Sequence, residues 1–110
     1  MTTYYYLNED KTFRPATMIE WAEQLESLHL TGTYQVADNN LGRYWISTSW
    51  LGFNNPLDEE ILLFETIIFK KDDANEFHLI NQNKYPTYAE AQEGHKDAMA
   101  WVINEINGTE

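Results

Sequence analysis

The chain has 110 residues, of which 43% are apolar, and it includes four Trp, seven Tyr and five Phe. A chain of this length forms one domain around one core. The absence of cysteine excludes disulfides, thiolate catalysis and cysteine-based metal sites. A net charge of −11 disfavours direct binding to nucleic acid, because that binding depends on Lys and Arg side chains.

The first third of the chain predicts a strand followed by a helix. Residues 2–7 are β-branched and aromatic, which favours a strand. Thr17 and Glu20 form a capping box, in which each side chain satisfies a backbone amide of the first helical turn. One face of this helix is expected to be buried, and its residues at 100° spacing are Met18, Trp21, Ala22 and Leu25.

The middle of the chain predicts a four-strand meander, with strands at residues 33–37, 43–53, 61–69 and 77–81. The polar runs at 38–42 and 70–75 suit tight reversals between strands. Residues 43–53 carry aromatics on both alternating faces, which is typical of a central strand. Residues 77–81 form a short predicted edge strand.

A second capping box, Thr87 with Glu90, begins a helix that we expect to end at Ile106, with residues 107–110 as a frayed tail. Its predicted buried stripe is Tyr88, Ala91, His95, Ala98, Met99, Val102 and Ile106. The predicted fold is therefore a single α+β domain over residues 1–110. Its element order is β-α-β-β-β-β-α, with two helices packed on a mainly antiparallel sheet of four to five strands.

The most unusual polar residue is Glu65, which lies inside an apolar strand and therefore needs partners. A hairpin places it roughly opposite Ser47 and near Thr48, and His95 in the second helix is a further candidate. We interpret Glu65, His95, Ser47 and Thr48 as a structural polar cluster that locks the helix to the sheet. The alternative is a hydrolase with Ser47 or Ser49 as nucleophile, His95 as base and Glu65 as orienting group.

The sequence predicts neither a metal site nor a cofactor site. His29, His78 and His95 are far apart in sequence, and the acidic loops lack a calcium-binding pattern. Acidic and aromatic surface residues are instead candidates for binding a partner protein. These candidates are Glu90, Glu93, Asp97, Trp101, Asp58, Glu59, Glu60, Asp72 and Asp73.

Three segments together resemble a family of small uncharacterised phage and prophage proteins: WISTSWLG at 45–52, LFETIIF at 63–69, and 85–95, which opens YPT and ends GH. The family pattern is an STxxLG strand, an FET strand and a helix beginning YxTxxEAxxGH. The loop after Gly52 is shorter here, and residues 72–83 are added. The resemblance implies a virus-encoded protein that acts inside a bacterium, and it assigns no role to any residue.

Three functions are compatible with these patterns. The first is a non-enzymatic phage accessory protein that binds a host or viral protein with a basic surface, for example as an acidic anti-defence inhibitor of a nucleic-acid-binding enzyme. The second is a virion or assembly component that self-associates, and the third is the hydrolase. We expect a protein in the cytoplasm of the host cell that contacts neither a membrane nor nucleic acid directly.

Overall fold

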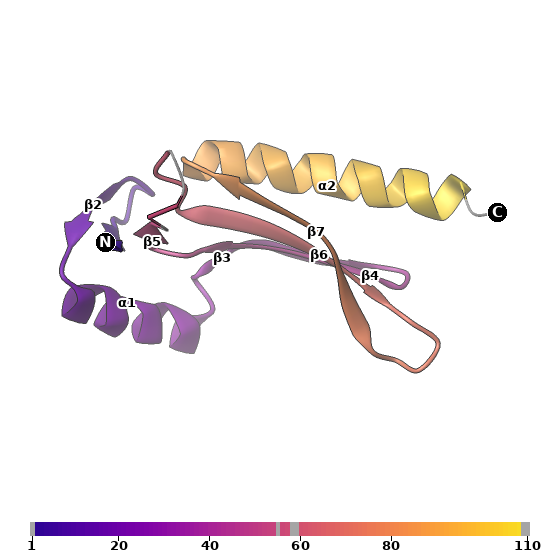
Figure 1. Ribbon diagram of the computed structural model, residues 1–110, viewed down its shortest axis with the longest axis horizontal. Helices are drawn as coiled ribbons and strands as arrows, with labels where there is room; N and C mark the ends of the chain where they lie inside the picture. The colour runs from indigo at the N-terminus through magenta and orange to yellow at the C-terminus, as the bar shows by residue number, and fades with distance from the viewer. Residues whose placement is uncertain (1, 55, 58–59, 109–110) are drawn as a thin grey trace.

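The computed structural model describes residues 2–54, 56–57 and 60–108. It confirms a single α+β domain in which every strand pair is antiparallel (Figure 1). The elements in chain order are β1 (Thr3–Leu7), β2 (Phe13–Ala16), α1 (Met18–Thr31), β3 (Gln35–Leu41), β4 (Tyr44–Trp50), β5 (Phe53–Asn54), β6 (Phe64–Lys71), β7 (Phe77–Tyr85) and α2 (Tyr88–Gly108).

The strands divide into two sheets. The predicted meander forms a four-stranded sheet in the order β3-β4-β6-β7, whereas β1 pairs with β2 and β5 in a second, three-stranded sheet. β2 was not predicted, because its segment contains Pro15. The predicted strand 43–53 is split at Gly52, which has a φ of 76°. A Cβ there would lie 2.6 Å from Nε1 of Trp21, so the bend requires glycine.

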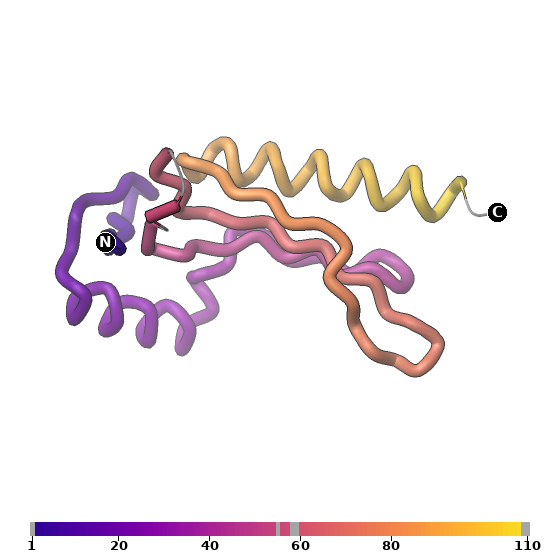
Figure 2. The backbone as a smooth tube through the Cα atoms, in the orientation of Figure 1, coloured from indigo at the N-terminus to yellow at the C-terminus, as the bar shows by residue number. Residues whose placement is uncertain are grey.

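α2 covers one face of the four-stranded sheet, as its apolar stripe predicts (Figures 1 and 2). Its buried residues are Ala91, Gly94, His95, Ala98 and Val102. Glycine at position 94 permits a close approach, since a Cβ there would overlap the ring of Tyr85. The apolar layer beneath the helix includes Tyr44, Ile46 and Ile68.

α1 packs on the three-stranded sheet rather than on the larger one. The capping box between Thr17 and Glu20 is present in both directions, and Gly32 ends the helix with a φ of 73°. The predicted buried face was partly wrong. Met18 and Ala22 are exposed, whereas Gln24 is buried and bonds both backbone groups of Leu7, at 2.8 Å and 2.7 Å.

Several predicted boundaries shift because strand pairing extends into segments with a strong turn preference. β3 includes Asp38 to Leu41, so the reversal narrows to Gly42 and its neighbours. The edge strand β7 has nine residues instead of five. α2 continues through Asn107 and Gly108, beyond the predicted helix end at Ile106, while residues 109–110 lie outside the described part of the chain.

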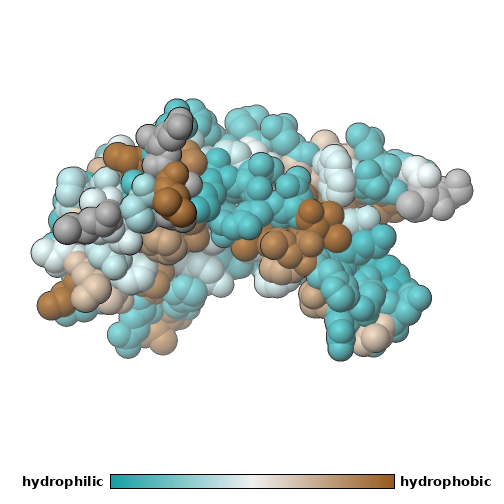
Figure 3. All heavy atoms as spheres, viewed as in Figure 1, coloured by the Kyte–Doolittle hydropathy of each residue, from teal (hydrophilic) through white to brown (hydrophobic). Residues whose placement is uncertain are grey.

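The molecule is elongated, with extents of 49 × 28 × 26 Å and a radius of gyration of 15.3 Å. A compact domain of this length has a radius of gyration of about 13 Å. The accessible surface is 7090 Å², compared with about 6,300 Å² for an average monomer of 12.9 kDa. Figure 3 shows the outline hollowed between α1 and the β6–β7 hairpin. The fold therefore exposes more surface than an average monomer of the same mass.

Candidate functional site

His95 is the centre of a buried polar network between α2 and the four-stranded sheet. Its Nδ1 lies 2.7 Å from the hydroxyl oxygen of Thr48, and its Nε2 lies 2.8 Å from Oδ1 of Asn39. The Thr48 hydroxyl also bonds the hydroxyl of Thr66. Thr48 is 0% exposed and His95 is 3% exposed. Thr48, Thr66 and His95 are buried and Asn39 is half-buried, and the bonds of the network link α2 to three adjacent strands.

The partners of the ring assign its tautomer. Oδ1 of Asn39 accepts a hydrogen bond, so the proton lies on Nε2, and Nδ1 accepts from the hydroxyl of Thr48. Burial lowers the pKa of His95 below 6.5, and the nearby Asp38 carboxylate opposes that shift. The neutral ring is therefore the form that the fold favours.

The predicted contact between Glu65 and His95 is wrong. Thr66 faces α2 through its bond to Thr48, and adjacent strand residues point to opposite faces, so Glu65 points away from the helix. Glu65 pairs with Ser49 across β4, not with Ser47, and its carboxylate accepts a hydrogen bond from the side-chain amide of Gln82. Strand alternation in the sequence separates Thr66 from Glu65, but only the register of β4 with β6 makes Thr66 the partner of Thr48.

The residues proposed for a hydrolase are separated for the same reason. Ser47 and Ser49 alternate with Thr48 in β4, so they lie on the face opposite His95. Thr48 does contact the imidazole, but its 0% exposure leaves no path for a substrate. The predicted nucleophile, base and orienting group are not brought together.

The acidic hairpin loop after β6 contains a cluster that sequence spacing did not reveal. One ligand atom from each of Asp72, Glu76 and His78 lies within 4.8 Å of the others. The loop itself explains this geometry. One carboxylate oxygen of Asp72 accepts hydrogen bonds from the backbone amides of Ala74 and Glu76. The other carboxylate oxygen lies 2.6 Å from Nε2 of His78. These bonds, led by that of His78, lower the pKa of Asp72.

The remaining loop candidates behave as surface charges. Asp73 forms an exposed ion pair with Arg43 at 3.1 Å, and such pairs contribute little to stability. Glu60 is exposed. The predicted binding residues Asp58 and Glu59 lie outside the described residues.

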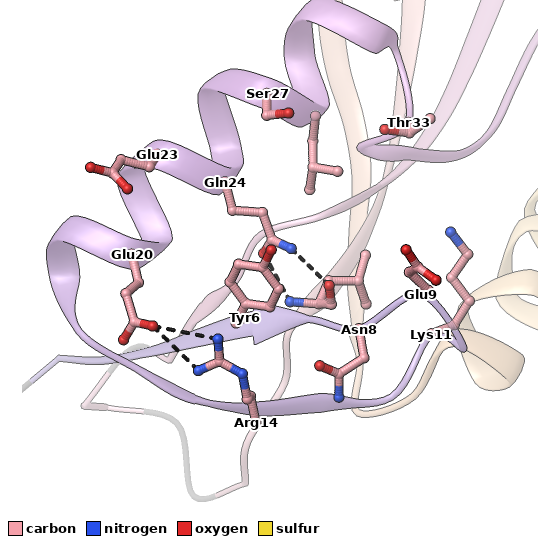
Figure 4. A pocket seen from close by; sticks show the side chains of 12 residues that line it. Tyr6, Asn8, Glu9, Lys11, Arg14, Glu20, Glu23, Gln24, Ser27 and Thr33 are labelled. Carbon is pink, nitrogen blue, oxygen red and sulfur yellow. Dashed lines mark hydrogen bonds and ion pairs between the residues drawn. The ribbon is translucent and has the colours of Figure 1, made fainter.

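A hollow of about 880 Å³ lies between α1 and the β1–β2 hairpin (Figure 4). Arg14 and Glu20 form an ion pair across its mouth at 3.4 Å, while Gln24 forms its inner wall against Leu7. The pKa of Glu20 is lowered, chiefly by the hydrogen bond that it accepts from the Thr17 amide. Arg14 and Glu20 are therefore engaged in pairing and helix capping within the fold, while Glu9, Lys11 and Glu23 also line the hollow.

The outer flank of α2 carries the predicted acidic residues. Glu90, Glu93 and Asp97 are all exposed, as their helical spacing predicts. Glu93 forms an exposed ion pair with Lys96 at 3.3 Å. Trp101 lies one turn beyond Asp97, is 39% exposed, and packs edge-on against Tyr44. Trp101 is thus partly buried against Tyr44, and part of its ring remains accessible.

Asp97 and Trp101 also line a groove of about 350 Å³ between α2 and β7. Its floor includes Ile68, and the β7 residues that line the opposite side are Asn81, Asn83, Lys84 and Tyr85. Gly94 and Ala98 line the same flank of the helix, and the missing side chain of Gly94 makes room for the ring of Tyr85, which also lines the groove.

Comparison with protein-family models, with curated proteins and with solved structures returned no match to this chain. The part of the chain that the structure describes contains no helix that is long and apolar enough to cross a membrane.

Proposed function

We propose that this protein is a non-enzymatic binding protein that recognises a partner with a basic surface. The observation that carries the proposal is the α2 flank, where Glu90, Glu93 and Asp97 are exposed beside an accessible tryptophan. The functional groups most suited to chemistry, His95 and Thr48, are instead buried and bonded to each other.

The shape of the molecule supports this proposal. The accessible area exceeds the expected value by about 800 Å². One partner contributes roughly 800 Å² to a standard protein–protein interface. A bound partner would cover an area of this size. A net charge of −11 favours a basic partner and disfavours an acidic one.

The sharpest form of the proposal follows from the resemblance to phage proteins. The carboxylates on α2 would occupy the basic surface of a host enzyme that normally holds nucleic acid. The protein would then act in an infected bacterium as an acidic inhibitor. Its binding should weaken steeply with salt, because the attraction is between exposed charges.

The test compares two variants that lose the same charge. Glu90→Gln, Glu93→Gln and Asp97→Asn together change the α2 flank, while Glu9→Gln, Glu23→Gln and Glu26→Gln together change exposed residues near α1. Each protein is used to capture partners from bacterial lysate at low salt, and the captured protein is then purified and titrated. We expect only the α2 variant to lose binding. Recovery of no partner, or equal loss in both variants, would overturn the proposal.

Self-association is a second candidate, and it rests on the sheet face opposite α2. The rings of Trp45 and Phe69 stack at 5.2 Å there, and Phe77, which is 47% exposed, contacts both. Leu79 pairs with Phe69 across the strands and is also exposed. An apolar face of this kind would be covered in an oligomer. Sedimentation as a monomer at high concentration would remove this candidate.

A further inference from the structure

We infer that the partner binds as an extended segment added to the edge strand β7, with Arg or Lys side chains at alternate positions entering the groove between β7 and α2. This inference rests on the proposed function and specifies how the basic partner is recognised. It assigns the backbone of β7 to the segment's main chain, and it assigns Asp97 and Trp101 to its side chains.

The first support for strand addition comes from the backbone geometry of β7. β7 is the last strand in the order β3-β4-β6-β7, so it turns one backbone edge outward. Its first seven residues are all exposed. The register shift opposite Ile68 and Phe69 disturbs its first half, whereas Asn81–Tyr85 pairs with β6 in unbroken register. An exposed regular edge of this length is a template for a further strand.

The second support comes from the position of the groove beside β7. Asn81 and Asn83 pair with Ile68 and Thr66, and Thr66 faces α2, so both asparagines lie on the helix side of the sheet. On a strand added beside them, alternate side chains point to the same side. Those side chains would lie over the groove that Asp97 and Trp101 line.

The chemistry of the groove selects the side chains. Asp97 offers an exposed carboxylate, and Trp101 lies one helical turn away with part of its ring accessible. A guanidinium or ammonium group pairs with the carboxylate and also packs on the indole face. Asn83 adds an amide group that can bond the same cation or the segment's own side chains, whereas Oδ1 of Asn81 already accepts a hydrogen bond from the Gln82 amide at 2.8 Å.

A second copy of this chain is a poorer occupant of the same edge. Two β7 strands that paired antiparallel about a two-fold axis would form one continuous sheet, with both α2 helices on the same face. The flanks that carry Glu90 and Asp97 would then face each other, and like charges would oppose the contact. A basic segment of another protein is instead attracted to the same carboxylates by its opposite charge.

The probe for this inference is a capped peptide that alternates Thr and Arg over seven residues, titrated calorimetrically at low salt. We expect it to bind, and we expect the same peptide with Glu in place of Arg not to bind. Two further peptides carry N-methyl groups on either the Thr or the Arg amides. Because one set of amides faces β7, one methylated peptide should lose binding and the other should keep it.

Protein variants and amide exchange locate the site. Asp97→Asn and Trp101→Leu should each weaken binding about three- to fivefold. Glu26→Gln on α1, an equal charge change far from the groove, should alter it less than about twofold. The bound peptide should slow hydrogen exchange at alternate amides within Asn81–Tyr85. Thermal unfolding of each variant verifies that it is folded.

The outcomes separate this inference from the proposed function. Equal binding of both methylated peptides, or unchanged exchange in β7, overturns strand addition while the acidic binding surface stands. A stable dimer whose formation protects the β7 amides, with no peptide binding, also overturns the inference and assigns the edge to a second copy. Failure of the lysate experiment removes the proposed function itself, whichever peptides bind.

Discussion

The hydroxyl of Thr48 and Nδ1 of His95 lie 2.7 Å apart and join the centre of β4 to the middle of α2. Both residues are buried, and Thr66 and Asn39 complete their hydrogen bonds. Loss of one partner in such a network leaves the other unsatisfied, which costs about 1–3 kcal/mol. The network thereby fixes where α2 lies on the sheet.

A double-mutant cycle tests this arrangement. We expect Thr48→Val and His95→Gln to be coupled by about 0.5–3 kcal/mol in urea unfolding, because the two side chains are bonded directly. The matched control is Glu65→Gln with His95→Gln. Since Glu65 lies on the other face of the sheet, those two changes should add within about 0.5 kcal/mol. Strong coupling in the control would restore the predicted Glu65–His95 contact.

The lowered pKa of His95 predicts how stability depends on pH. The unfolded chain, with a histidine pKa near 6.5, binds a proton before the native protein does as the pH falls. The contribution of neutral His95 is therefore complete above about pH 6.5 and decreases below it, by at most about 1.4 kcal/mol per pH unit. The measurement is the difference in unfolding free energy between the wild type and His95→Gln from pH 8 to pH 4.5. A difference that stays constant or grows on acidification contradicts the burial of the neutral ring.

The side-chain amide of Gln24 bonds Leu7 as a neighbouring strand would, because it donates to the Leu7 carbonyl and accepts from the Leu7 amide. We expect Gln24→Ala to lower the unfolding free energy by about 1–3 kcal/mol, as two buried backbone groups lose their partner. Glu23→Ala on the exposed neighbouring position should change it by less than about 0.5 kcal/mol. Similar losses in both variants would mean that helix propensity, not the bond to Leu7, decides the effect.

The contact between Gly94 and Tyr85 sets the approach of α2 to β7. An added methyl group at Gly94 would overlap the tyrosine ring, so Gly94→Ala should destabilise the protein by about 1–3 kcal/mol. In a Tyr85→Leu background the destabilisation by Gly94→Ala should shrink. It should move toward the stabilisation of about 1 kcal/mol that alanine gives over glycine in a helix. Gly108→Ala is the control, since a Cβ there meets no atom within 4 Å. An equal cost in both backgrounds would exclude the ring as its cause.

The sequence alone determined most of the local structure. The Thr17–Glu20 box, the meander and the buried stripe of α2 were all predicted, because capping and hydrophobic periodicity act over a few residues. The exposure of Glu90, Glu93 and Asp97 followed from the same helical period. The predictions were weakest in Asp- and Asn-rich segments, where cross-strand pairing overrode turn preference.

Tertiary structure alone decided which face of the sheet α2 covers. Ser47 and Ser49 are two residues apart, so the predicted and observed partners of Glu65 lie on the same face of β4. Alternation defines two sets of side chains in each strand, but both sets of β4 contain aromatic and hydroxyl residues, so neither set marks the buried side. Packing of α2 on the face of Thr48 and Thr66 settled the choice, which brought His95 to Thr48 and left Glu65 on the opposite side.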